Sequence, residues 1–453
     1  MHQVSSNITF IFTGLLVAMI LSLAFEEKLH AKKSVIVGLF AVITLLCAAI
    51  FGLVHPETVQ ILGHPITLPV YIPGIDWEVI AIILGSSLFV DVTSKCGLFT
   101  WIAIKLTKAS GGDPLKLLIF YGVMTVVFSA VLNNVTAMII VGTLSGVSLA
   151  KLRLTNKLLG FLLIEGLLTN VGGMLTLISS VPNIIVGNTA GITFVTFFIK
   201  ASPYVAVATA VTIWMGARLF NIQRLQNDAA KAEAATLVAG FDENDGIESA
   251  GFFRFGTAMT GLFIVAMATV SITPYIKELG MGYVALAFAA IMLTRYKATA
   301  DRFYQAIDWD LLAFFGGLFI VINMMEHALV LNLIGDGLTP IIDLGETLGT
   351  GVLLVAAAVA SSVTDNIPLA AMLAKILGGM NLPSDSPFWW AVIFGANLGG
   401  NLTPIGSAST LVAVTIIHKN KLPMSFVTFV KAALPFAVVQ LALAAAFVLI
   451  FLR

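Results

Sequence analysis

Three polar sequence blocks occur twice in this chain, inside otherwise apolar stretches. Leu-Asn-Asn-Val-Thr at 132–136 returns as Thr-Asp-Asn-Ile-Pro at 364–368, and Asn-Val-Gly-Gly at 170–173 returns as Asn-Leu-Gly-Gly at 397–400. Ile-Asp-Trp-Glu at 75–78 returns as Ile-Asp-Trp-Asp at 307–310. Amides, hydroxyls and helix-breaking residues at matching positions of two apolar halves are typical of the solute site of a membrane transporter. The blocks therefore predict a duplicated membrane protein that binds a small polar solute.

The candidate substrate-binding residues are the amides and hydroxyls of these blocks and of the segments beside them. They are Asn133, Asn134, Thr136, Asn170, Thr176, Ser180, Asn183, Asn366, Asn397, Thr403 and Ser407. Helices that break there would free N-termini with partial positive charge and spare N–H donors. We expect these groups to surround one polar cavity near the membrane midplane. The alternative is that the amides and hydroxyls only join helices to one another.

Two carboxylates are candidates for proton coupling, Asp365 and Glu165. A carboxylate deep in a bilayer is costly and indicates a functional site. The first-half counterpart of Asp365 is Asn133, which cannot exchange a proton. Glu165 lies five positions before Asn170, deep in its predicted span. The alternative role for either residue is a structural ion pair or hydrogen bond.

Other kinds of chemistry have no signature in the sequence. The chain lacks a phosphate-binding Gly-x-x-x-x-Gly-Lys-Ser/Thr loop, and no His-Glu-x-x-His motif or paired His/Cys spacing is present. We therefore expect no enzyme activity, no metal ligands, no cofactor and no nucleic-acid partner. The two cysteines, Cys47 and Cys96, are expected to be small core residues.

Composition indicates that most of the surface faces lipid. Hydrophobic residues make up 58% of the 453 residues and charged residues 11%, whereas soluble domains carry about 25% charged residues. The run at 8–24 lacks a basic region before it and a cleavage site after it, so we expect a retained span. Ten apolar runs have membrane length. They lie near 8–24, 34–54, 77–94, 158–190, 201–217, 255–272, 280–294, 309–325, 388–415 and 427–451.

Two further stretches, 115–150 and 349–378, carry a polar break near the middle and are expected to be re-entrant hairpins. With the N-terminus outside, 20 of the 24 Lys and Arg residues then fall on the cytoplasmic side, a strong positive-inside bias. The predicted fold is an all-α polytopic membrane protein. It has two inverted repeats, each with five spans and one hairpin, and broken helices at the midplane.

The predicted first half is 1–217, with the broken span 158–190, and the second is 255–453, with the broken span 388–415. Residues 218–254 would form a cytoplasmic linker with a short helix at 228–237 and a flexible turn at 242–246. A soluble ATPase could dock on this linker, although a solvated connection is the simpler interpretation. A homodimer is also possible.

At these blocks the chain resembles the ion transporter superfamily that includes the ArsB-type arsenite-efflux permeases, the P-protein group and the NhaD-type sodium/proton antiporters. Ser-Ala-Val-Leu-Asn-Asn-Val-Thr at 129–136 resembles the family's Asp-Asn-Val-Thr hairpin motif, with Asn133 in place of the acid. The segment 169–185 resembles the P-protein block, with Ser180-Val181 in place of Asp-Pro. Leu-Thr-Pro-Ile-Gly-Ser at 402–407 resembles the arsenite-permease version. The resemblance implies secondary transport.

Two acidic positions of the relatives are neutral here, at Asn133 and Ser180. An amide- and hydroxyl-lined site with one proton-exchanging carboxylate suits a neutral solute such as As(OH)₃ or Sb(OH)₃. The sequence therefore favours proton-coupled efflux of arsenite or antimonite across the cytoplasmic (inner) membrane. The alternatives are a Na⁺/H⁺ antiporter and a carrier of a small carboxylate or other anion.

Overall fold

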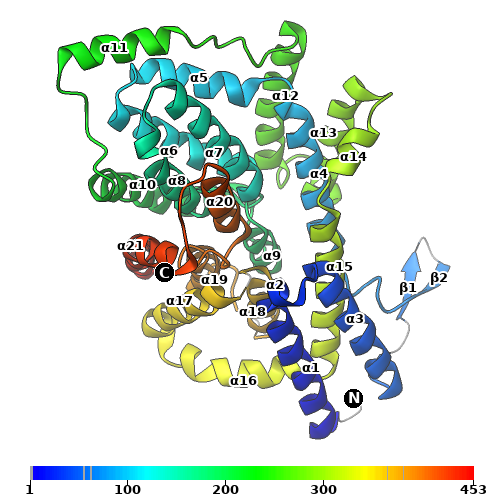
Figure 1. The fold of residues 1–453 in the computed structure, drawn as a ribbon. Coiled ribbons are helices and arrows are strands. Elements are labelled where there is room, and N and C mark those ends of the chain that lie inside the picture. The colour runs from blue at the N-terminus through cyan, green and yellow to red at the C-terminus, as the bar shows by residue number, and fades with distance from the viewer. Residues whose placement is uncertain (1–3, 55–56, 62–63, 365, 381, 453) are drawn as a thin grey trace.

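The computed structural model describes residues 4–54, 57–61, 64–364, 366–380 and 382–452 (Figure 1). Asp365, one of the two predicted proton-coupling residues, lies outside these ranges. The described chain is helical except for one small antiparallel hairpin. The architecture is therefore that of the all-α protein predicted from the sequence.

The first half of the chain runs to the end of α10. Its elements are α1 Ser6–Ala24, α2 Glu26–Leu29, α3 Lys33–Ile50, β1 Glu57–Ile61, β2 His64–Leu68, α4 Trp77–Ser94, α5 Leu98–Ser110, α6 Pro114–Val131, α7 Asn134–Lys151, η1 Thr155–Lys157, α8 Leu158–Gly172, α9 Val181–Ala190 and α10 Phe194–Leu219. A connecting segment then carries α11 Asp228–Ala239.

The second half begins with α12. Its elements are α12 Ala250–Thr269, α13 Ile276–Leu293, η2 Thr294–Tyr296, α14 Asp301–Ala306, α15 Trp309–His327, α16 Val330–Ile342, α17 Gly345–Val363, α18 Asn366–Gly379, α19 Pro387–Gly399, α20 Ala408–Lys419 and α21 Phe426–Phe451. The helix order α4–α10 thus returns as α15–α21.

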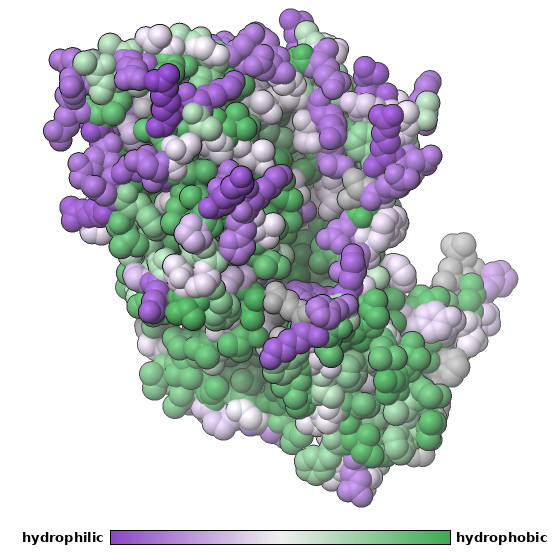
Figure 2. Space-filling model, in the orientation of Figure 1, coloured by the Kyte–Doolittle hydropathy of each residue, from purple (hydrophilic) through white to green (hydrophobic). Residues whose placement is uncertain are grey.

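Apolar side chains cover much of the outer surface. Eleven of the described helices are long and apolar enough to cross a membrane. Large side chains on these helices, such as Val42, Ile199 and Ile450, are 63–67% exposed. Figure 2 shows a hydrophilic end, which carries α11, above a broadly hydrophobic body. Exposed apolar surface on this scale marks a membrane-facing protein, so the chain is a multi-pass membrane protein.

The helix breaks fall at the polar blocks. The stretch 115–150 divides into α6 and α7, and 349–378 divides into α17 and α18. The runs 158–190 and 388–415 are interrupted between α8 and α9 and between α19 and α20. The short helices α5 and α16 and the β1–β2 hairpin were not predicted, because each is shorter than a membrane span and lies between stronger apolar signals.

Long helices of one half pack along helices of the other. In the first half, α4 packs against α13, and α15 of the second half packs against α3. Glycines permit both close approaches. A Cβ on Gly85 would lie 2.5 Å from the backbone of Ala285, and one on Gly317 would lie 3.1 Å from the Val37 side chain. Because Gly85 and Gly317 are 232 residues apart, the two crossings use equivalent positions.

The Asp-Trp blocks begin α4 and α15. Asp76 and Asp308 cap these helices by accepting hydrogen bonds from backbone N–H groups three residues later. The indole N–H groups of Trp77 and Trp309 each donate to a carbonyl five residues earlier, at 3.1 and 2.8 Å. These contacts give the repeated Asp-Trp pair a structural role at the two helix starts.

The acidic residue after each tryptophan bonds to the other half of the chain. The Glu78 carboxylate accepts from the Gly282 N–H of α13 at 2.9 Å, and the Asp310 carboxylate accepts from the Ser34 hydroxyl of α3. Each block therefore fixes one end of a helix crossing as well as the start of its own helix.

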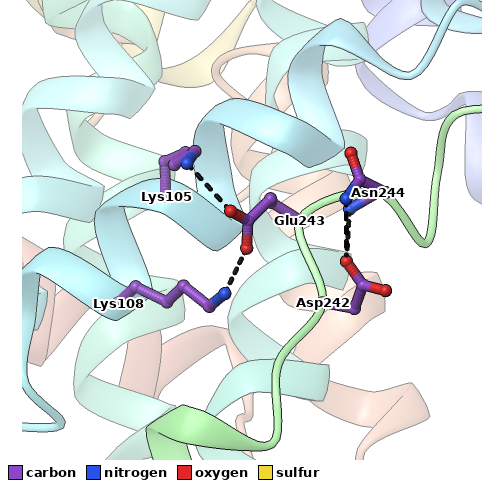
Figure 3. A network of polar contacts seen from close by, with 5 residues as sticks. All are labelled: Lys105, Lys108, Asp242, Glu243 and Asn244. Atoms are coloured by element: carbon purple, nitrogen blue, oxygen red, sulfur yellow. Dashed lines mark hydrogen bonds and ion pairs between the residues drawn. The ribbon is translucent and has the colours of Figure 1, made fainter. Parts of the chain in front are cut away.

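The connecting segment is held against the first half. Glu243 accepts from Lys105 at 2.9 Å and also pairs with Lys108, both on α5 (Figure 3). The hydrogen bond from Lys108, and to a lesser extent that from Lys105, lowers the pKa of Glu243 to about 2. Asp242 accepts from the Asn244 N–H and closes the turn (Figure 3). The predicted turn is present, and it is docked on α5.

Candidate substrate-binding site

The tip of the first hairpin places two amides in different surroundings. The Asn133 side chain is exposed and caps α7 by accepting from the Thr136 N–H at 2.7 Å. Asn134 turns inward, where its Oδ1 accepts from the Ser129 hydroxyl at 2.7 Å. A Cβ on Gly173 would lie 2.5 Å from that amide oxygen, so the first glycine block is needed for this contact.

Each hairpin is joined to a broken helix by one repeated hydrogen bond at its first arm. The Ser129 hydroxyl donates to the Thr169 carbonyl at 2.6 Å, and the Ser361 hydroxyl donates to the Ala396 carbonyl at 2.6 Å. The serines are 232 residues apart and the acceptors 227 apart, as the sequence blocks are. The duplication is thus visible in the bonding as well as in the sequence.

A second bond of the same kind involves two predicted site residues. Thr176 donates to the Ala130 carbonyl and Thr403 donates to the Ser362 carbonyl, both at 2.5 Å. These carbonyls lie near the C-terminal ends of α6 and α17, where helix carbonyls lack intrahelical partners. Both threonine hydroxyls therefore stabilise the hairpins.

The two broken segments are closed by side chains at equivalent positions. The Asn183 amide donates to the carbonyls of Gly173 and Thr176 at 2.6 and 3.0 Å. The Thr410 hydroxyl contacts the carbonyls of Gly400 and Thr403 at 3.3 and 3.5 Å, and that of Ser407 at 2.8 Å. These bonds satisfy backbone groups that the breaks would otherwise leave unpaired inside the protein.

Asn170 connects the first half to the second. Its amide nitrogen donates to Asn401 Oδ1 at 2.8 Å and to the Ser407 hydroxyl at 3.0 Å. Its oxygen accepts from the Ser409 hydroxyl at 2.9 Å and from the Asn134 amide at 3.4 Å. The side chain is fully buried, so these protein groups supply its hydrogen bonds.

Asn397 makes the reciprocal connection. Its oxygen accepts from the Ser180 hydroxyl at 2.7 Å, and its nitrogen donates to Asn183 Oδ1 at 2.9 Å. Ser180 and Ser407 are the N-cap residues of α9 and α20. Each broken helix therefore uses its asparagine to bond the start of the other half's second segment.

Several members of this network were not predicted from the sequence. They are Ser129, Thr212, Ser361, Asn401, Ser409, Thr410 and Gln440. Asn401 donates to Gln440, which donates to Thr212 at the far end of this buried chain. Outside the repeated blocks, the available signal was a polar residue within an apolar run. Such residues are also common as simple contacts between helices.

Glu165 is fully buried on α8. One carboxyl oxygen accepts from the Ser145 hydroxyl of α7 at 2.5 Å. The other has no hydrogen-bond partner among the described residues. The equivalent position of the second half is Val392. Glu165 is therefore a polar group that the duplication does not repeat.

A cavity of about 660 Å³ lies beside the second hairpin. Thr364 and Pro368 of the hairpin and Ile405 of the second broken segment line it. Lys28 and Lys33 line it as well, from the α1–α3 connection. Asn366 starts α18, the second arm of this hairpin, and is buried. The cavity therefore adjoins the second hairpin tip and the second broken segment.

The predicted residues thus fall into groups. Hydrogen bonds join Asn134, Asn170 and Ser407, and also Ser180, Asn183 and Asn397. Thr176 and Thr403 bond the hairpin carbonyls, while Asn133 lies on the exposed tip with Thr136. The N-termini of α7, α9 and α20 adjoin this neutral network, and they favour a negatively charged or hydroxylated solute.

Comparison with known proteins identifies relatives over most of the chain. A family described as "Citrate transporter" (CitMHS) matches residues 20–395. An uncharacterized transporter of Mycobacterium bovis is 30% identical over 380 residues, covering 82% of this chain and 85% of that protein. The human P protein is 23% identical over 500 residues, covering 92% of this chain and 59% of that protein.

A solved structure supports the fold. The YdaH transporter of Alcanivorax borkumensis superposes with a TM-score of 0.60 at 11% sequence identity, covering 93% of this chain and 98% of that one. The superfamily predicted from the polar blocks agrees with these matches. Because the family match extends over most of the chain, this protein is a membrane transporter that belongs to the CitMHS citrate transporter family of the ion transporter superfamily.

Proposed function

We propose that this protein is a secondary transporter that carries a small carboxylate anion across the cytoplasmic membrane. The supporting observation is a pair of buried amide and hydroxyl clusters, one joining the starts of α7 and α20 through Asn170 and the other joining the start of α9 to Asn397. Helix N-termini carry partial positive charge and free N–H donors, which bind carboxylates without a full positive charge in the membrane.

The cavity beside the second hairpin supports the same substrate class. Among the described residues, Lys28, Lys33 and Glu26 are the ionisable groups that line it, and together they carry one positive charge. An excess of positive charge among these described side chains favours an anionic solute. The volume of about 660 Å³ falls within the usual range for small-molecule sites. The description of the family as a citrate transporter agrees with a carboxylate.

Efflux of arsenite or antimonite is the second candidate. The observation that favours it is the neutrality of the network, in which every described member is an amide or a hydroxyl. A neutral trihydroxide would exchange hydrogen bonds with these groups and would need no counter-charge.

Coupling to protons would use Glu165, Asp365 or both. Glu165 is on the same helix as Asn170, and one of its oxygens is unpaired among the described groups. Ionising such a group inside a membrane is costly, so a change in its surroundings during transport would change its proton occupancy. Asp365 belongs to the proposal through its sequence position alone.

The proposed transport cycle uses two inverted halves, 1–217 and 255–453, joined by a cytoplasmic segment at 218–254. In Figure 1, α5 lies at the end of the molecule near α11, while its counterpart α16 lies at the opposite end. That arrangement supports the inversion, and the excess of Lys and Arg around α5 and α11 supports a cytoplasmic location for that end.

Transport by the purified protein in proteoliposomes tests the substrate. The panel is labelled citrate and smaller di- and monocarboxylates, arsenite, antimonite and ²²Na⁺, each with and without an imposed pH gradient and without ATP. Saturable carboxylate uptake that unlabelled substrate competes away supports the first candidate. Transport of arsenite or Na⁺ without transport of carboxylates would contradict the first candidate. A requirement for ATP and a second protein would contradict secondary transport.

Glu165→Gln tests the coupling residue in the same assay. We expect pH-driven accumulation to fall, while exchange of labelled for unlabelled substrate at equal pH continues. The matched control is Glu346→Gln, which makes the same change on the exposed start of α17 and should leave accumulation intact. Unchanged accumulation and pH dependence in Glu165→Gln would assign coupling to another group, and Asp365→Asn would then be measured.

A further inference from the structure

A long groove lies on the outer surface between α6 and α10. Its volume is about 1120 Å³. Apolar side chains of both helices line most of its length, including Ile119, Val123 and Ala210. All three are exposed, and both helices are of membrane length. In the membrane this part of the groove faces acyl chains.

One end of the groove is polar and basic. Arg218 and Arg224 line it, together with the amides of Asn221, Gln223 and Gln226. Arg218 lies over the Trp214 ring, with the guanidinium carbon 4.5 Å from the ring centroid. Within the described residues, neither arginine forms an ion pair. Two guanidinium groups and several amides therefore remain for an external anion.

The carboxylate of Asp113 lies beside the loop at this end, and both of its oxygens already accept hydrogen bonds. Asp113 caps α6 by accepting from the Lys116 N–H at 2.9 Å, and its other oxygen accepts from the Leu225 N–H at 3.0 Å. This second bond holds the residue next to Arg224. Asp113 thus fixes the position of the loop at the polar end of the groove.

The groove also reaches the broken helix of the first half. Leu175 and Val126 line its inner wall. Leu175 precedes Thr176, which bonds the hairpin carbonyl of Ala130. A Cβ on Gly172 would lie 2.7 Å from the Val126 backbone, so the hairpin arm and the broken helix are in tight contact here. A molecule in the groove would therefore touch both elements.

We propose that this groove binds an anionic phospholipid, with its phosphate at Arg218 and Arg224 and its acyl chains along α6 and α10. Arginine binds phosphate through paired N–H donors, and basic pockets between transmembrane helices are known to hold anionic headgroups. A soluble anion would fill only the polar end, whereas a phospholipid matches both parts of the groove.

The bound lipid would also affect transport, and this part rests on the proposed function. Its acyl chains would lie against Leu175 and Val126, where the hairpin meets the broken helix. Movement of these two elements would change the lipid contacts, so the occupied groove would favour one arrangement.

Native mass spectrometry tests binding without any transport assay. The protein is exchanged from detergent into mixed phosphatidylcholine and phosphatidylglycerol, and the retained lipids are counted. We expect one phosphatidylglycerol to be retained preferentially, and Arg218→Gln/Arg224→Gln to weaken its binding about tenfold or more. The matched control is Arg302→Gln, an exposed arginine on α14 outside the groove, which should retain the lipid.

Ala210→Trp is the second variant, because it fills the apolar part and keeps both arginines. It should also lose the lipid, whereas binding through the headgroup alone would leave retention unchanged and overturn the proposal. Equal retention of phosphatidylcholine, or inorganic phosphate that competes fully with the lipid, would overturn it as well. A dimer that Ala210→Trp dissociates would also overturn the proposal, because a second copy of the chain would then occupy the groove. Thermal stability in lipid-free detergent identifies misfolded variants, and Arg224→Gln alone then replaces the double variant.

Discussion

Replacing Asn170 by alanine should weaken the fold by an amount that its bonding predicts. The side chain makes hydrogen bonds with Asn401, Ser407, Ser409 and Asn134, from one fully buried position. Hydrogen bonds between transmembrane helices contribute about 0.6 kcal/mol on average, so four amount to about 2.4 kcal/mol. The equilibrium constant for unfolding should then rise about fifty-fold.

The value of about 0.6 kcal/mol per hydrogen bond is appropriate because most partners of Asn170 keep another hydrogen bond. Ser407 still contacts Ser409 and Thr410, and Asn134 still accepts from Ser129. If every partner were left unsatisfied, the cost would rise to about 1–3 kcal/mol for each group. The cavity left by the truncation adds to the destabilisation.

The measurement is reversible unfolding of the purified protein in mixed micelles, compared with Asn420→Ala. Asn420 is exposed and its amide donates to one carbonyl of its own helix, so its loss should cost less than about 0.5 kcal/mol. Wild-type stability for Asn170→Ala would refute the argument that this asparagine joins the two halves. A loss of transport without a loss of stability would assign Asn170 to substrate contact alone.

Four further predictions follow from particular contacts. Gly85→Ala should destabilise the α4–α13 crossing by about 1–3 kcal/mol, because its Cβ would lie 2.5 Å from backbone atoms, whereas Gly14→Ala, with open space around it, should be neutral or slightly stabilising; thermal unfolding of both compares them. Trp77→Phe and Trp309→Phe each remove one indole hydrogen bond and should cost about 1 kcal/mol each; a large effect of only one would contradict their equivalence. Glu243→Gln should increase hydrogen exchange in 240–249, and high salt should do the same in the wild type. Because its pKa is lowered to about 2 by Lys108 and Lys105, the contact should persist above the unfolded value of about 4.3 and be lost only as the pH falls towards 2, which exchange at several pH values checks.

The sequence by itself determined the class of the protein and the location of its special segments. The low charge content and the long apolar runs leave lipid as the solvent for most of the surface, because a soluble fold cannot cover itself with so few charges. The repeated blocks located the hairpin tips and the helix breaks. Asn readily caps a helix start and paired Gly weakens a helix, so their occurrence inside apolar runs indicates a break. Asn133 is the cap of α7 and Gly173 lies at the first break.

The tertiary structure decided which of these residues meet. No pattern in the sequence indicates that Asn170 bonds Ser407 of the other half, or that Asn397 bonds Ser180. Those pairs depend on the packing of α20 against α7 and α8 and of α9 against α18 and α19. The docking of Glu243 on α5 likewise could not be predicted from the sequence, because a Lys and a Glu 138 positions apart carry no sequence signal of contact. Local breaks follow from local chemistry, whereas partners across a duplicated membrane fold follow from the packing of whole helices.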